Sequence, residues 1–403
     1  MYAETFDYTG PIAAFVYKYL YLLFGRSAFI HYGLSSLIII FQAGVFNQLM
    51  LKNKAYDENS YLPAFLYMIL MVSIPDFMTL SPQLMSLTFV LLSLRNVLRR
   101  IDNQVKDELF LNAGFYLGIA AMIYLQSMVF ILIFLFALII FSTAVTRRIL
   151  LYLFSFLLAF SLCTLYFYWR DDFSVFLDSY VVQNLLLSSS SPLELVEILV
   201  IGAFFIAIFL LSVIKTWSTA RLTQFQQKIQ QMMWLMLIGA VATFLLSNEK
   251  SLHELVFTIP VITYFWTHYF ILIKRRIFKA IMPALLVFGI LTYSILNYQL
   301  RMEPLVLSQR TPETGLMVLG SDLSYYQEVE MLTPCFNEHL SKRAFKGLNY
   351  YQSASEIYLL FERANPDKIL DQIGVMPDVQ SRFVPMEKKY RIVSEAEYQK
   401  ISN

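Results

Sequence analysis

Carboxylates are the side chains of this sequence best suited to chemistry next to an apolar scaffold. A charged group inside a membrane domain is costly, so an acid in such a place is a candidate functional residue. Glu4 and Asp7 come just before the first apolar segment. Such a pair could supply a general base and a group that holds a metal ion or an acceptor. The alternative is a solvated chain end without a chemical role.

Two further groups follow or separate apolar segments. Arg170, Asp171 and Asp172 come directly after Trp169. They could clamp a lipid phosphate or a divalent cation, because guanidinium suits phosphate and paired acids suit hard cations. An exposed, self-paired helix end is the alternative. Asp76 lies between two prolines in SIPDFMTLSP; it is either a fourth substrate-binding candidate or the cap of the next helix.

Histidine and cysteine give no support for metal or redox catalysis. No histidine has a metal-ligating partner at i+3 or i+4, and C-x-x-C is absent. The two cysteines fall in different segments and predict no disulfide framework. We therefore expect no resident metal or cofactor, and a divalent cation or a polyprenyl-phosphate lipid only if the protein is a transferase. The residues concerned are His31, His253, His268, His339, Cys163 and Cys335.

The composition indicates whether these residues lie in a water-soluble protein or in a membrane protein. Of 403 residues, 58% are hydrophobic and 15% are charged, whereas soluble domains carry about 25% charged residues. The excess predicts a polytopic membrane protein in contact with lipid. The net charge of +2 gives no field that would attract nucleic acid, so we expect no such partner.

A bilayer crossing takes about 20 apolar residues, and the sequence holds about ten candidate membrane segments. A shorter run, Ile12–Phe24, predicts an amphipathic helix in the outer interface, and Lys215–Gln231 predicts a second one on the inner side. The candidate segments are Phe29–Leu51, Tyr61–Ile74, Pro82–Leu98, Leu109–Leu125, Ser127–Phe141, Ile149–Tyr168, Leu193–Ile214, Met232–Leu246, Leu255–Ile273 and Ala280–Leu296.

Basic residues predict the orientation, since Lys and Arg are retained in cytoplasmic loops. They concentrate in one set of alternate loops. The other set and the N-terminal segment hold only Lys18, Arg26, Arg170 and Lys250. This bias places both termini outside and predicts a multi-pass protein of a bacterial inner membrane with periplasmic termini.

The composition changes to that of a soluble domain after residue 299, so we expect an outer interfacial segment (1–26), a transmembrane domain (27–299) and a periplasmic domain (300–403). In the last part the pattern predicts a buried strand followed by a turn in Gly315–Gly320, a turn followed by a strand in Asn365–Gln372, and a last strand at Arg391–Val393. It predicts helices at Asp322–Leu332 and Ser353–Ala364. Alternating strands and helices favour a small α/β domain with a parallel sheet.

Several stretches resemble one class of membrane enzymes. Gly10–Met50, Ser81–Arg100 and Asn112–Phe141, with Gly114, Gly118 and Ala120 in a G-x-x-x-G-x-A pattern, are similar to segments of GT-C glycosyltransferases, which use lipid-phosphosugar donors. A closer resemblance is to an uncharacterised polytopic integral-membrane family of Bacteroidota. It shares the N-x-x-x-P pattern of Asn59–Pro63 and the phrase PDFMTLSP.

The resemblance implies a GT-C-like fold, but active members begin with a membrane helix that leads to an acidic motif. Here only Glu4 and Asp7 stand where that acid would be. We therefore expect an accessory or scaffold subunit of an envelope complex for secretion, glycosylation or polymer assembly, with other membrane or periplasmic subunits as partners. The alternative is an active transferase in which Glu4 or Asp7 is the base and Arg170 with its neighbouring acids holds the donor.

Overall fold

A computed structural model describes most of the apolar part of the chain and portions of the C-terminal part. By internal contacts the chain divides into two compact units, one of residues 6–294 and a smaller one that includes residues 295–403. The described residues are 10–24, 28–56, 60–101, 107–141, 146–171, 173, 176–182, 184, 206–207, 209–217, 222–247, 252–273, 309–311, 316–319, 330–331, 358, 361–362, 365–371, 376–394 and 397–401.

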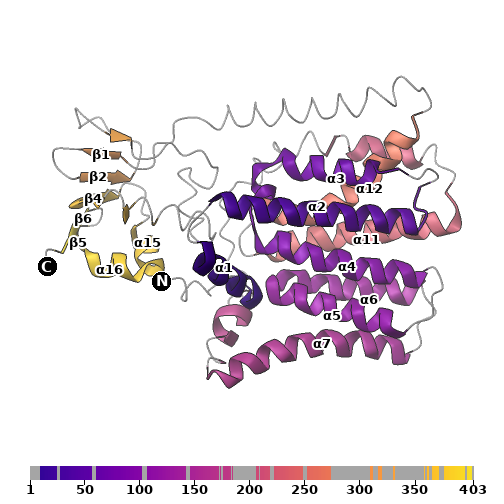
Figure 1. The fold of residues 1–403 in the computed structure, drawn as a ribbon, viewed down its shortest axis with the longest axis horizontal. Helices are drawn as coiled ribbons and strands as arrows, with labels where there is room; N and C mark the ends of the chain where they lie inside the picture. The colour runs from indigo at the N-terminus through magenta and orange to yellow at the C-terminus, as the bar shows by residue number, and fades with distance from the viewer. Residues whose placement is uncertain are drawn as a thin grey trace. The chain divides into compact units, whose positions relative to one another are not determined.

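In the larger unit the long helices lie side by side as a bundle with nearly parallel axes (Figure 1). Short helical turns join several of them at the ends of the bundle. The helices are α1 (Pro11–Phe24), α2 (Ala28–Lys52), α3 (Leu62–Ser73), α4 (Pro82–Ile101), α5 (Asp107–Ile123), α6 (Val129–Phe141), α7 (Thr146–Trp169), α11 (Gln224–Leu246) and α12 (Ile259–Ile271), and the turns are η1 (Pro75–Met78), η2 (Leu125–Met128), η3 (Phe176–Val182) and η4 (Leu252–Thr258).

Three of these helices are long and apolar enough to cross a membrane: Tyr32–Lys52, Thr146–Trp169 and Gln224–Leu246. Shorter apolar helices occupy Leu62–Ser73 and Leu125–Phe141. The prediction of a membrane protein with transmembrane helices is thereby confirmed, whereas the number of ten crossings stays a prediction. Of the expected segments, Ala280–Leu296 lies outside the described residues and Leu193–Ile214 is described only from residue 206 onward.

Local capping explains where two helices start. The start of α4 agrees with the sequence prediction, and the start of α11 does not. Pro82 begins α4 after Ser81, whose hydroxyl oxygen accepts a hydrogen bond from the Leu84 N–H at 3.1 Å. Ser81, rather than Asp76, therefore caps this helix. Thr223 caps α11 through a capping box: its side chain accepts a hydrogen bond from the Gln226 N–H, and the Gln226 side chain accepts one from the Thr223 N–H. The predicted interfacial helix Lys215–Gln231 is wrong, because this cap starts a helix that continues to Leu246.

Two glycines bring α5 and α7 into close contact. A Cβ atom on Gly114 would lie 2.1 Å from the carbonyl oxygen of Tyr152, and one on Gly118 would lie 2.5 Å from the Ala159 Cβ atom. Helices that cross in a membrane associate through such small residues, because lipid tails are as apolar as the side chains. The G-x-x-x-G spacing of the sequence therefore forms a seam with α7.

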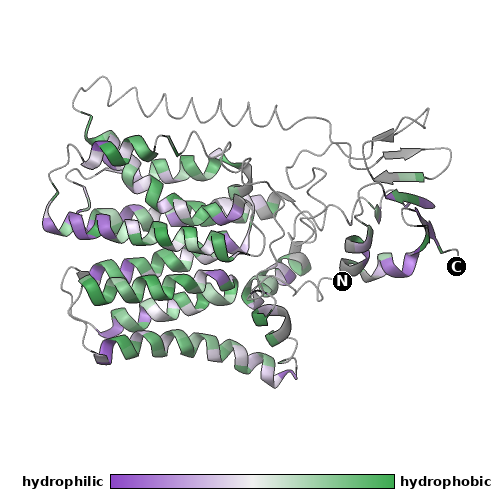
Figure 2. Ribbon diagram, turned by 180° about the vertical axis from the view of Figure 1, so that it is seen from behind, coloured by the Kyte–Doolittle hydropathy of each residue, from purple (hydrophilic) through white to green (hydrophobic). Residues whose placement is uncertain are grey.

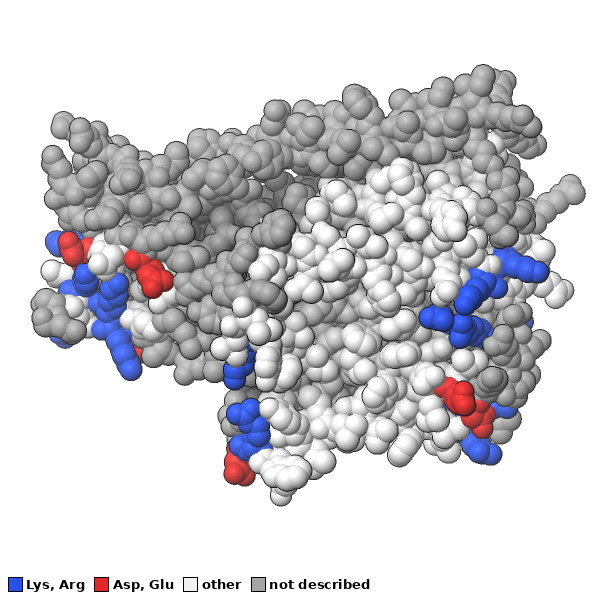
Figure 3. All heavy atoms as spheres, in the orientation of Figure 1, with Lys and Arg blue, Asp and Glu red and all other residues white. Residues whose placement is uncertain are grey.

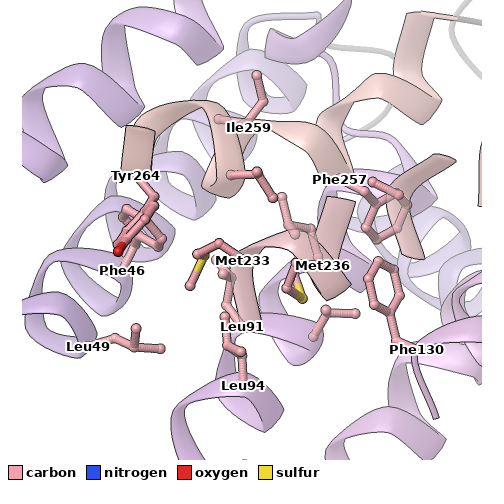
Figure 4. Close-up of a cluster of buried hydrophobic side chains, with 14 of the residues drawn as sticks. Phe46, Leu49, Leu91, Leu94, Phe130, Met233, Met236, Phe257, Ile259 and Tyr264 are labelled. Atoms are coloured by element: carbon pink, nitrogen blue, oxygen red, sulfur yellow. The ribbon is translucent and has the colours of Figure 1, made fainter. Parts of the chain in front are cut away.

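The core of the larger unit lies between α2, α4, α6, α11 and α12. Met233 and Met236 of α11 lie among Leu91 and Leu94 of α4, while Phe257 of η4 faces Phe130 of α6 (Figure 4). The two rings have centroids 5.4 Å apart. Thioether side chains adapt to irregular gaps, so they suit the centre of a bundle in which helices of several lengths meet.

Charge differs between the two ends of the bundle. The end at which α2 and α4 finish and α5, α7 and α11 begin carries Lys52, Arg95, Arg99, Arg148 and Lys228; we call it the basic end. Figure 3 shows a larger group of Lys and Arg side chains at one end of this unit and a smaller group at the other, and Figure 2 shows hydrophobic residues along the length of its helices. An ion pair between Arg148 Nε and Asp107 Oδ1 at 3.1 Å joins α7 to α5 there. We call the opposite end the Glu254 end.

The smaller unit contains a six-stranded sheet in the order β3-β1-β2-β4-β6-β5, next to α15 (Met376–Arg382) and α16 (Val384–Lys389) in sequence. Only β2 and β4 pair in parallel among the described strands; the other four pairings are antiparallel. The prediction of a parallel sheet is therefore wrong. The strands are β1 (Gln309–Thr311), β2 (Leu316–Leu319), β3 (Glu330–Met331), β4 (Lys368–Asp371), β5 (Tyr390–Ser394) and β6 (Glu397–Lys400).

The predictions of individual strands and helices in the smaller unit have mixed outcomes. The expected strands in 315–320, 365–372 and 391–393 are confirmed by β2, β4 and β5. The expected helix Asp322–Leu332 is wrong at its end, because Glu330 and Met331 pair with β1. Arg391–Val393 is not the last strand, since β6 follows and pairs with β5 and β4. Within the expected helix Ser353–Ala364, the described residues 358, 361 and 362 are helical.

Candidate functional site: a buried carboxyl at one end of the bundle

Glu254 is an acid held inside the larger unit with 1% of its surface exposed. It lies in η4, between α11 and α12. Its Oε1 atom accepts hydrogen bonds from Gln83 Nε2 at 3.0 Å, from Ser247 Oγ at 2.9 Å and from the Tyr124 hydroxyl. Donors from three separate parts of the chain therefore meet at one oxygen. We call Gln83, Tyr124, Ser247 and Glu254 the Glu254 cluster.

Local structure fixes each donor. Gln83 is the second residue of α4, where Pro82 and the Ser81 cap set the backbone. Tyr124 has an extended backbone between α5 and η2, and the Ser127 N–H bonds to its carbonyl oxygen at 3.1 Å. Its ring stacks on Phe257, with centroids 6.2 Å apart. Ser247 directly follows α11. The breaks between helices thus place the polar groups.

The hydrogen bonding of the cluster is incomplete. Among the described residues, no donor forms a hydrogen bond to Glu254 Oε2, and the same holds for Gln83 Oε1. Buried polar atoms are almost always paired, so each exception calls for an explanation. The two exceptions here belong to side chains already joined by the bond from Gln83 Nε2 to Glu254 Oε1.

Electrostatics favours a neutral carboxyl at this place. Turn η4 lies outside the three helices that are long enough to span, and burial there raises the pKa of Glu254 from 4.5 to about 7. The hydrogen bonds from Tyr124, Gln83 and Ser247 oppose this shift, because they favour the ionised form. Desolvation is the largest cause, so the group changes protonation in the neutral range.

The acids predicted to be catalytic, Glu4 and Asp7, lie outside the described residues, as does Asp172. Asp76 falls in η1, and its side chain is not described. The catalytic and substrate-binding roles expected for these four residues stay predictions.

Arg170 and Asp171 are described and exposed just after α7. Arg170 Nη1 donates to the Tyr166 hydroxyl oxygen at 2.9 Å, and Asp171 has a positive φ of 59°. Arg170 therefore leans back along its own helix. The proposed clamp for a phosphate or a cation stays a prediction.

Metal-ligating side chains do not gather in the part of the chain that the structure describes. No group of three or more His, Cys, Asp or Glu residues there could hold a metal ion. The Glu254 cluster contributes one carboxylate and one amide oxygen, fewer than a hard divalent cation takes from oxygen ligands. Its chemistry is therefore that of a proton and hydrogen bonds.

From the sequence alone, Glu254 was assigned no role. The residue lies in a short polar interval, SNEKSLHE, which is typical of an exposed loop. Two of its three partners are distant in sequence, with Gln83 171 residues away and Tyr124 130 residues away. The available signal was an acid directly before the apolar run Leu255–Ile273.

Comparison with known proteins identifies no relative: no family model, no curated protein and no solved structure matches the chain.

Proposed function

We propose that this protein is an integral inner-membrane accessory or scaffold subunit of a bacterial envelope complex that serves secretion, glycosylation or polymer assembly. Its partners would be membrane lipids and other membrane or periplasmic subunits. The helical bundle would hold the protein in the membrane, and the sheet-containing unit would present a surface to partners.

The burial of Glu254 supports this proposal over an enzyme. A general base has to come within hydrogen-bond reach of the group from which it takes a proton. Glu254 is enclosed by Gln83, Tyr124 and Ser247 and is 1% exposed. Among the described carboxyls at this end, Glu254 is therefore closed to a substrate, while Asp171 is exposed in a turn.

Charge supports the orientation that goes with this role. The basic end would face the cytoplasm, because Lys and Arg are retained on that side. The Glu254 end, η1 and the start of α4 would then face the periplasm, as would both termini. Helix α1 fits an interfacial position at that end, since Leu22 and Leu23 are exposed whereas Tyr17 is buried and donates to the Leu80 carbonyl oxygen at 2.8 Å.

Purification of the full chain in a gentle detergent tests the proposal, with mass spectrometry of the proteins and lipids that remain bound after size exclusion. The proposal expects stoichiometric protein partners and no polyprenyl lipid. A lone monomer that carries a polyprenyl-phosphate sugar would overturn it in favour of the glycosyltransferase alternative.

Two variants serve as a matched pair for that experiment. A chain that lacks Thr311–Asn403 should still insert in the membrane but retain less of each partner. The double variant Glu4→Gln and Asp7→Asn should retain partners at the level of the unaltered chain, because a scaffold does not use these acids as bases. Full partner retention after the deletion contradicts the role given to the sheet-containing unit.

A further inference from the structure

The two unpaired oxygens of the Glu254 cluster belong to side chains that one hydrogen bond already joins. A carboxylic acid and a primary amide can form two parallel hydrogen bonds, one from the amide N–H to the acid carbonyl and one from the acid O–H to the amide carbonyl. The first bond is present, from Gln83 Nε2 to Glu254 Oε1 at 3.0 Å. The atoms that the second bond would join are Glu254 Oε2 and Gln83 Oε1, the two oxygens that lack a donor.

From this geometry we propose that Glu254 and Gln83 form a proton-binding site, in which a proton on Glu254 Oε2 is donated to Gln83 Oε1. One proton then satisfies both buried acceptors at once. Its release leaves a charged carboxylate with three donors at Oε1, and it leaves the amide oxygen of Gln83 unpaired.

Other occupants fit less well. A sodium or calcium ion takes several oxygen ligands, and the described residues offer two unpaired oxygens here. A water molecule needs room and two to four polar partners. A proton needs no additional volume, which matters because Gln83 and Glu254 are 6% and 1% exposed. A proton is therefore the occupant that would satisfy both oxygens without added volume.

No cation among the described residues pairs with the carboxylate. Elements α4, α11, α12 and η1 pack on η4. The titratable or basic residues on these elements, and those adjoining the cluster, are Arg95, Arg99 and Arg100 near the end of α4, Lys228 near the start of α11, Tyr264, His268 and Tyr269 on α12, Asp76 in η1, and Tyr124 and His253 at the cluster itself. Burial is the largest cause of the raised pKa.

The site joins parts of the fold that are far apart in sequence. Gln83 belongs to the first turn of α4, and Glu254 belongs to the turn between α11 and α12. The proton-dependent bond is therefore one link between α4 and η4. Loss of the proton removes that link and places a charge in a buried position, so we expect η4 to open locally as the pH rises through neutrality.

Infrared difference spectroscopy between pH 5 and pH 9 tests the site on the full chain in lipid nanodiscs. The unaltered protein should show a protonated-carboxyl C=O band at pH 5 that disappears toward pH 9, and Glu254→Gln should lack it. Gln83→Leu should keep the band but shift its frequency, since the acid loses its amide partner. Size exclusion of both variants checks that they remain folded.

Two results would overturn the proposal. One is the absence at pH 5 of any carboxyl band that depends on Glu254. The other is a titration midpoint that moves in proportion to the sodium concentration at constant pH, which would identify a cation site. A midpoint independent of sodium, together with the frequency shift in Gln83→Leu, supports the proton-binding site.

Discussion

Two buried polar groups in the bundle differ in how completely they are paired. Gln42 on α2 is fully buried; its Nε2 donates to the Leu84 carbonyl oxygen and to Thr88 Oγ1, both at 2.8 Å, and its Oε1 accepts from the Tyr67 hydroxyl at 2.9 Å. We call Gln42, Tyr67 and Thr88 the Gln42 cluster. The Glu254 cluster has a similar set of donors but leaves two oxygens without one.

This difference in hydrogen bonding distinguishes a cluster with a structural role from one that can change its protonation state. A fully paired buried network adds specificity to the packing and has nothing to gain or lose in the range of ordinary pH. A partly paired network that contains a carboxyl can gain a proton. We therefore interpret the Gln42 cluster as a fixed link of α2, α3 and α4, and the Glu254 cluster as a link that depends on pH.

The largest expected effect is on the pH dependence of stability. Between pH 4.5 and about 7 the folded chain holds a proton on Glu254 that the unfolded chain releases. The free energy of unfolding should therefore fall as the pH rises through this window, by about 3 kcal/mol at most, and should level off above it. Thermal unfolding in detergent at a series of pH values measures this slope.

Glu254→Gln is the matched control for that slope, because a neutral amide cannot titrate. Its midpoint temperature should stay nearly constant from pH 5 to pH 8, apart from a background shared with other variants. An equal slope in the variant and in the unaltered chain would assign the pH dependence to other groups.

Gln42→Leu tests whether the Gln42 cluster stabilises the bundle independently of pH. The change leaves the buried Tyr67 hydroxyl without its acceptor and removes a partner of Thr88, which costs about 2 kcal/mol. The loss should be the same at pH 5 and at pH 8, since no titrating group is involved. A loss that grows with pH would mean that the two clusters are coupled.

Tyr124→Phe measures how much one donor of the Glu254 cluster contributes to the pKa of Glu254. The Tyr124 hydroxyl bond lowers the pKa of Glu254, so its removal should move the titration midpoint of the carboxyl upward, by about one pH unit or less. Because Oε1 keeps Gln83 and Ser247 as donors, the protonated form should lose only about 1 kcal/mol of stability. The carboxyl infrared band reports the midpoint, and a downward shift would contradict this assignment.

Thr88→Val is expected to have the smallest effect. Gln42 Nε2 keeps the Leu84 carbonyl oxygen as an acceptor, and the side-chain volume is nearly conserved. The cost should be about 0.5–1 kcal/mol, close to the average for hydrogen bonds between membrane helices. Chemical denaturation of this variant beside Gln42→Leu should rank the two. A larger cost for Thr88→Val would mean that Thr88, not Gln42, is the centre of the cluster.

Much of the helical architecture follows from the sequence because its causes are local. Apolar runs bounded by basic residues and prolines predicted α2 through α7 within a few residues. The start of α11 was missed, because the amide-rich stretch before Met232 was interpreted as a separate surface helix. The Thr223 and Gln226 capping box was a local signal that could have corrected this.

The candidate site could not be predicted in the same way, because its causes are long-range. Nothing near Glu254 in sequence indicates that Gln83 and Tyr124 surround it. Likewise, Glu330 and Met331 adopt a strand because β1 offers a free edge, against a local pattern that favours a helix. Tertiary pairing decided both cases, and a single sequence does not display it.

Because glycines join α5 closely to α7, a change in bilayer thickness that tilts α7 should also move the C-terminal end of α5. At 1.5 Å per residue, the 24 residues of α7 extend about 36 Å, more than the roughly 30 Å of a hydrocarbon core. A helix of this length tilts in a thin bilayer, and α5, packed on it through Gly114 and Gly118, would tilt with it. Tyr124 directly follows α5, so lipids of different chain length should shift the protonation midpoint of Glu254.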